Sequence, residues 1–153
     1  MTLIELLVVI VIIALAASLT VAWLGGGERD RLQTQVVQLD RDWRLAASVA
    51  LGQQRVIGWR PTQEGYEFVA WEPARDGGHW TALALETTPL SPRQWSRPTE
   101  LAMTPPPDDE DDRPWVVWWP QGEVLGGTLA LSRGGERRTL TLDALGVHRE
   151  PEA

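Results

Sequence analysis

Apolar residues follow three different patterns along the chain. Residues 6 to 24 form one run without a charge, in which Ser18 and Thr20 are the only polar side chains. A second segment has apolar residues at spacings of three and four, which is the signature of one buried helix face. Its apolar positions are Leu32, Val36, Leu39, Trp43, Ala46 and Ala50. From Gln53 the period shifts toward two and turn residues become frequent, which predicts strands.

The polar residues of the second segment are expected on the opposite, solvated face of that helix. They are Arg31, Gln35, Gln38, Arg41, Asp42 and Ser48. Strands are expected at residues 55–60, 66–72, 80–85, 115–119, 128–132 and 137–143, with turns at 61–65, 76–78, 126–127 and 134–135. The pattern predicts an α+β fold, in which a long N-terminal helix packs on antiparallel β-sheets.

The apolar run has the length of a membrane-spanning helix. Its 19 residues extend about 28 Å at the helical rise, close to the roughly 30 Å hydrocarbon core of a bilayer. A cleaved signal peptide is the alternative, because Ala14-Leu15-Ala16 resembles a cleavage site. The run is longer than a usual signal core and no basic stretch precedes it, so a retained transmembrane helix is favoured.

These patterns divide the chain into four parts. We expect a transmembrane or filament-core helix at residues 1–24 and a glycine joint at residues 25–27. An amphipathic stalk helix at residues 28–52 and a β-rich head at residues 53–153 follow. Each glycine lowers helix stability by about 1 kcal/mol relative to alanine. The joint is therefore expected to be either flexible or a helix end.

Glu5 is the only charged residue before the glycine joint. A carboxylate at the centre of a membrane helix costs about 2.5–3.5 kcal/mol, and less near the end of the span. The side chain either reaches the headgroups or pairs with a cation. The first arginine is Arg29, so the available cation is an α-amino group, its own or that of a neighbouring subunit.

Charge and cysteine content exclude several classes of function. Residues 28–153 carry all 14 arginines and 20 acidic residues, which is a net charge of −6. An acidic domain is a poor partner for nucleic acid, because phosphate binding needs Lys and Arg. The same charge argues against docking onto anionic lipid headgroups. The absence of cysteine excludes structural disulfides and Cys-ligated zinc.

The first nine residues, Met1 to Val9, resemble the mature N-terminus of type IV pilins and type II secretion pseudopilins. In those families a prepilin peptidase cuts before the first residue and methylates its amine, and a glutamate at position five helps to align new subunits. The resemblance thus implies that Met1 is the processed, N-methylated residue and that Glu5 acts in subunit assembly. The family usually has Phe where this chain has Met1.

The rest of the chain is similar to the H-type minor pseudopilins of type II secretion (the GspH family). The similarity lies in residues 45–47, 55–58, 65–68, 92–95, 120–122, 129–131 and 140–146. It implies a pilin-like subunit without enzymatic activity, near the tip of a periplasmic pseudopilus. The subunit would link a tip complex of other minor pseudopilins to the major-pseudopilin shaft. Its expected location is the bacterial inner membrane, with the head in the periplasm.

Two further features carry candidate chemistry. The acidic run 108–112 has the oxygen ligands that calcium takes, but lacks the glycine and the ligand spacing of a defined calcium loop. A mobile solvated loop is therefore favoured, and no metal or cofactor is expected. Trp115, Trp118 and Trp119 would place tryptophan on both faces of one strand. They are expected either in the core, the favoured position, or at a subunit interface.

The sequence leaves alternative functions open. No nucleophile elbow, zinc-protease motif or phosphate-binding loop is present, so an enzyme is not expected. A minor pilin of a type IV pilus is the nearest alternative, although such pilins often carry a disulfide. A membrane-tethered periplasmic binding module that never polymerises is the second alternative, and it would have no requirement for Glu5.

Overall fold

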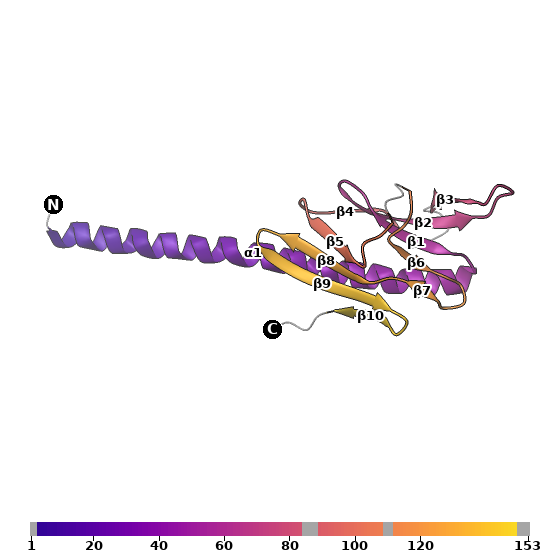
Figure 1. The fold of residues 1–153 in the computed structure, drawn as a ribbon. Helices are drawn as coiled ribbons and strands as arrows, with labels where there is room; N and C mark the ends of the chain where they lie inside the picture. The colour runs from indigo at the N-terminus through magenta and orange to yellow at the C-terminus, as the bar shows by residue number, and fades with distance from the viewer. Residues whose placement is uncertain (1–2, 84–88, 109–111, 150–153) are drawn as a thin grey trace.

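The protein consists of one long helix and two antiparallel sheets that cover part of it (Figure 1). The computed structural model describes residues 3–83, 89–108 and 112–149, and within the helix it describes the side chains of residues 3–14 and from Gly27 onward. The helix α1 spans Leu3–Gln53. Its N-terminal half projects from the head, and its C-terminal half lies along the sheets.

Helix α1 continues through the three glycines, so the expected helix end at residues 25–27 is not present. The two predicted helices are therefore one element. About 1 kcal/mol per glycine weakens a helix without preventing it, because both flanking segments favour the same conformation and propagation adds one hydrogen bond per residue.

The first sheet has strand order β3-β2-β1-β6-β7, with β4 pairing to β2 beside β3, and the second has order β10-β9-β8-β5. The bounds of the first sheet are β1 Ile57–Pro61, β2 Gly65–Glu72, β3 His79–Ala82, β4 Arg93–Gln94, β6 Val116–Trp118 and β7 Val124–Leu125. The bounds of the second sheet are β5 Glu100–Thr104, β8 Thr128–Arg133, β9 Glu136–Asp143 and β10 Gly146–Arg149.

Each predicted strand corresponds to an observed one, with ends that differ by up to two residues where the structure describes them. Residues 84–85 of the predicted strand 80–85 lie outside the described residues. The hydrophobic pattern does not predict β4, β5, β7 or β10. All four lie at or near sheet edges and are at most five residues long, which leaves little periodicity to detect.

The chain passes from the first sheet to the second between β4 and β5, and again at Gly126-Gly127, between β7 and β8. A Cβ atom built on Gly127 would lie 2.4 Å from the Thr104 carbonyl oxygen, and one on Gly126 would lie 2.6 Å from the Leu142 carbonyl oxygen. The two sheets can therefore approach closely here only because neither position carries a side chain.

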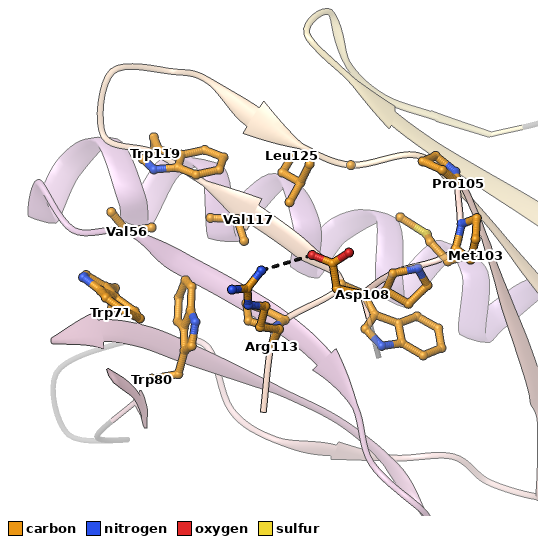
Figure 2. Close-up of a pocket in the computed structure, with 15 residues that line it drawn as sticks. Val56, Trp71, Trp80, Met103, Pro105, Asp108, Arg113, Val117, Trp119 and Leu125 are labelled. Carbon is orange, nitrogen blue, oxygen red and sulfur yellow. Dashed lines mark hydrogen bonds and ion pairs between the residues drawn. The ribbon is translucent and has the colours of Figure 1, made fainter. Parts of the chain in front are cut away.

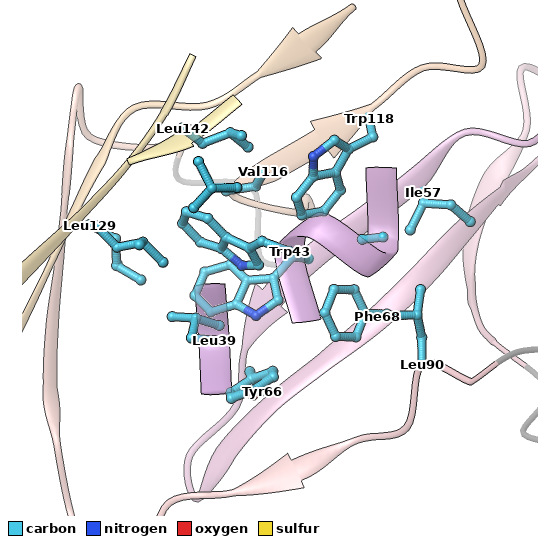
Figure 3. Packing of buried hydrophobic residues seen from close by; sticks show 14 of the residues in the cluster. Leu39, Trp43, Ile57, Tyr66, Phe68, Leu90, Val116, Trp118, Leu129 and Leu142 are labelled. Carbon is cyan, nitrogen blue, oxygen red and sulfur yellow. The ribbon is translucent and has the colours of Figure 1, made fainter. Parts of the chain in front are cut away.

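The core lies between α1 and the inner faces of both sheets (Figure 3). The six predicted apolar positions of the stalk helix are all buried, which confirms that face. Trp43 meets Trp59 of β1 at a ring-centroid distance of 5.4 Å and Trp118 of β6 at 6.2 Å, in edge-to-face geometry. Leu129 and Leu142 extend the core into the second sheet. One helix thus joins both sheets into a single head.

Candidate assembly surface

Residues 3–14, in the projecting half of α1, expose a continuous apolar surface. Large side chains from Leu3 to Ile13 are between 47% and 84% exposed, and they occupy every side of the helix. A helix that is apolar all round is normally buried, either in protein or in lipid. The head lies far from residues 3–14 (Figure 1), so burial of their apolar side chains requires another molecule.

Glu5 lies in the first turn of α1 and is exposed. A carboxylate in the first turn interacts favourably with the positive end of the helix dipole. Met1 and Thr2 lie outside the described residues, so the predicted pairing with an N-terminal amine stays a prediction. Nothing else on the described part of the projecting half is charged before Glu28.

Among the described residues, no helix offers a window long and apolar enough to span a bilayer.

The three clustered tryptophans do not share one environment. Trp118 is 1% exposed and belongs to the core, so its side chain is unavailable for a surface contact in this structure. Trp115 and Trp119 are half-buried and line a cavity on the outer face of the first sheet. Trp115 also packs on Trp59 at 6.2 Å. The interface hypothesis thus stays a prediction for Trp115 and Trp119 alone.

The cavity on the outer sheet face has a volume of about 460 Å³ (Figure 2). Its walls are largely apolar, and the aromatic pair Trp71 and Trp80 stands on one side at a ring distance of 5.3 Å. Gly58 of β1 lies beside this cavity, where an added Cβ would come within 2.6 Å of Pro114. Because strand β6 is covered on its outer face as well, Val117 is buried along with Trp118.

The acidic loop borders this cavity. Asp108 pairs with Arg113 at 3.1 Å, and Asp112 pairs with Arg60 of β1 at 3.3 Å. Residues 109–111 lie outside the described part of the chain. Within residues 3–83, 89–108 and 112–149, no three acidic or histidine side chains are grouped to hold a metal. The calcium hypothesis falls mainly on the residues outside that part.

Asp42 was expected in solvent, and that prediction is wrong. Asp42 is 4% exposed, and its carboxylate accepts hydrogen bonds from Gln38 at 2.8 Å and from Tyr66 at 2.9 Å. Arg93 of β4 donates to it at 2.5 Å and 3.3 Å. The position beside Trp43, at the edge of the apolar stripe, was the one signal for burial. The arrangement is an anchor that joins α1, β2 and β4.

Solved structures share this architecture. The minor pseudopilin EpsH from the type II secretion system of Vibrio cholerae matches with a TM-score of 0.61 and 15% identity, over 79% of this chain and 94% of that one. A second structure of EpsH from Vibrio cholerae matches with a TM-score of 0.58 and 15% identity, over 77% of this chain and 94% of that one. The type IV minor pilin FimU of Pseudomonas aeruginosa matches with a TM-score of 0.53 and 18% identity, over 81% of this chain and 91% of that one.

Comparison at the level of sequence finds no matching family model and no matching curated protein. The predicted fold class is confirmed by the structural matches, because each covers most of both chains and the structure itself has a long helix packed on antiparallel sheets. The chain therefore has the pilin-like α+β fold of these minor pseudopilins and of a minor type IV pilin.

Proposed function

We propose that this chain is a minor pseudopilin of a type II secretion pseudopilus. The observation that carries the proposal is the uncovered half-helix, apolar on all sides and with Glu5 in its first turn, attached to a pilin-like head. A helix of this kind needs either a membrane or a bundle of like helices around it. A pseudopilin uses both, first the inner membrane and then the filament core.

In this account, residues 6–24 span the inner membrane before assembly, and the head lies in the periplasm. A prepilin peptidase processes and methylates Met1. The subunit then leaves the bilayer, and its apolar helix packs in the filament core. Lipid tails are as apolar as leucine, so contacts between the helices, chiefly van der Waals packing and polar pairs, stabilise the filament core in place of hydrophobic transfer.

In this account Glu5 determines the axial alignment of neighbouring helices, which apolar packing alone does not fix. A carboxylate within the apolar region is costly, and pairing with the N-terminal amine of a neighbouring subunit offsets that cost. Correct axial alignment brings the two charges together, whereas a shifted register leaves both unpaired. The partners are other minor pseudopilins and the major pseudopilin. We place the subunit near the tip, between the tip complex and the shaft.

A minor pilin of a type IV pilus is the second candidate, and the similarity to FimU favours it. Deleting the chain in its native cell separates the two candidates. A pseudopilin deletion abolishes export of the secreted protein and leaves surface pili intact. Loss of pili with normal export would instead assign the chain to a type IV pilus.

The cavity on the outer sheet face favours a third candidate, a tethered binding module. Ligand sites are typically mostly apolar concavities of about 300–1,000 Å³, and the Trp71–Trp80 cavity has that character. A tether needs only membrane insertion, so this candidate predicts full function without Glu5.

A further inference from the structure

Three guanidinium groups surround a single carboxylate where the projecting helix enters the head. Glu28 forms an ion pair with Arg133 at 3.0 Å and with Arg31 at 3.7 Å, and it accepts a short hydrogen bond from Arg97. These residues come from α1, from the loop between β4 and β5, and from the end of β8. We call Arg31, Arg97 and Arg133 the arginine cluster.

The arginine cluster has more donors than the protein satisfies. The Arg133 side chain is only 8% exposed, and its Nη1 donates to Gln35 at 3.2 Å. Its buried Nη2 finds no acceptor among the described residues. Nearby, the Nη2 of Arg138 is also buried without an acceptor there, although its Nε donates to Gln33 at 3.3 Å. Arg138 also pairs with Glu136 at 3.6 Å. Within the arginine cluster, one carboxylate, Glu28, faces three guanidinium groups. The side chains of Arg31 and Arg97 are 53% and 57% exposed, so positive charge that Glu28 does not balance is open to the surroundings.

The position of the arginine cluster along α1 determines its depth relative to a membrane. Glu28 follows the apolar run by four residues, which is about 6 Å at the helical rise. The polar headgroup layer on each side of a bilayer is roughly 5–8 Å thick. The tip of the β8–β9 hairpin lies beside this part of α1 (Figure 1), held there by Arg133 and Arg138. A span over residues 6–24 would set the cluster at headgroup level.

The negative net charge of the head does not reveal the positive charge that is concentrated at the arginine cluster. The soluble part is acidic overall, and on that basis docking to anionic lipid was not expected. The fold concentrates positive charge at one place, because it brings Arg97 and Arg133 from distant segments to Glu28, which Arg31 of the same helix already contacts. Arginine matches phosphate geometry with paired donors, and each basic residue near an anionic surface changes binding about fivefold.

We propose that the arginine cluster docks the head onto the phosphates of anionic phospholipids before the subunit enters the pseudopilus. The inference rests on the membrane insertion of the proposed function. Docking would hold the head against the bilayer in one orientation. Extraction into the filament then breaks those contacts, so docking stabilises the stored subunit relative to the assembled one.

Two single-cysteine variants of the full chain allow a direct test, because the natural sequence has no cysteine. Pro98→Cys places a polarity-sensitive dye on an exposed position next to Arg97. Leu145→Cys places it on the exposed turn at the far end of β9. Each labelled chain is reconstituted into vesicles of phosphatidylcholine alone or mixed with phosphatidylglycerol, and dye quenching by an aqueous quencher is measured together with vesicle flotation.

We expect the dye at position 98 to be protected only in vesicles with phosphatidylglycerol, and the dye at position 145 to stay accessible in both. Arg31→Gln with Arg97→Gln should reduce protection more than tenfold, as should high salt, whose Debye length of about 3 Å at 1 M screens exposed charges. The control pair Arg41→Gln with Arg75→Gln removes the same charge from exposed positions elsewhere and should leave protection unchanged.

Three outcomes would overturn the inference. Equal quenching in both vesicle types, with normal flotation, would reject docking while the membrane insertion stands. An equal loss of protection in both double variants would attribute the effect to net charge and reject the cluster. A chain that floats with neither vesicle type would reject the insertion, and the docking with it.

Discussion

The hydroxyl of Tyr66 donates a 2.9 Å hydrogen bond to Asp42, a carboxylate that is almost fully enclosed. Arg93 completes the contact from β4. Burial raises the pKa of Tyr66, and the charge of Asp42 and its hydrogen bond raise that pKa further, while Arg93 opposes the shift. Asp42 in turn raises the pKa of Arg93 through their hydrogen bond. Contact with Asp42 therefore favours the neutral hydroxyl of Tyr66 and the charged guanidinium of Arg93.

Tyr66 should resist ionisation at alkaline pH as long as the head stays folded. An unfolded tyrosine ionises with a pKa of about 10, and the folded pKa is higher. The anchor thus contributes its full stability below pH 10 and loses it as pH rises above that value. Tyr66 is the only tyrosine, so tyrosinate absorbance reports on it alone. The absorbance should rise together with unfolding, measured by circular dichroism. A rise near pH 10 in the folded protein would contradict this.

Asp42→Ala should destabilise the head by about 2–4 kcal/mol, because it leaves the buried hydroxyl of Tyr66 without its acceptor and removes the contacts to Gln38 and Arg93. Denaturant unfolding of the full chain in mild detergent measures the effect. Arg41→Ala, at the neighbouring exposed position of the same helix, is the matched control and should change stability by less than about 0.5 kcal/mol. Equal losses of stability in the two variants would contradict the structural role of Asp42.

Trp118→Ala should cost about 3–5 kcal/mol, because it opens a cavity in the core. Trp119→Ala should cost clearly less, since its side chain is half-buried at the edge of the outer cavity. If Trp119 contacts a neighbouring subunit, its alanine variant should fold normally and copurify less with other pilin-like proteins. Unfolding by Trp119→Ala would place that residue in the core instead.

Asp143 should titrate below the usual carboxyl range. The backbone N–H of Leu145 donates to its Oδ1 at 2.8 Å, which is the main cause of its lowered pKa, and His148 adds a smaller contribution at 3.2 Å. The contact stabilises the β9–β10 turn above a pH of about 3.9, the usual value, and is lost as pH falls through the lower folded pKa.

Carboxyl chemical shifts in NMR give this pKa directly. His148→Ala should leave most of the lowering in place, because the backbone hydrogen bond remains. A return to the usual value in that variant would mean that His148, and not the Leu145 N–H, carries the shift.

The local pattern of apolar residues was sufficient to predict part of the fold. The buried face of α1 from Leu32 to Ala50 was predictable, because its spacing repeats over several turns. The pairs β1–β2 and β8–β9 were also predictable, since each joins two alternating segments across a short turn. In these cases the signal and the contacts lie in the same stretch of sequence.

Other features depend on contacts between distant segments, which a single sequence does not reveal. Asp42 is buried by Tyr66 and Arg93, which are 24 and 51 residues away. The arginine cluster forms only when β8 and the β4–β5 loop meet α1 around Glu28. Local propensity is also misleading at Gly25–Gly27. The three glycines favour a helix end, but the helix continues because both flanking segments are helical.

The proposed function depends most directly on a role of Glu5 in subunit assembly. Its direct test compares Glu5→Ala and Glu5→Gln with the native chain in the native cell, scoring membrane insertion, copurification with other pilin-like subunits, and export of a secreted protein. We expect normal insertion with loss of copurification and of export in both variants, since Gln keeps the shape but not the charge. Normal behaviour in all three measurements would contradict the assembly role and favour a tethered binding module.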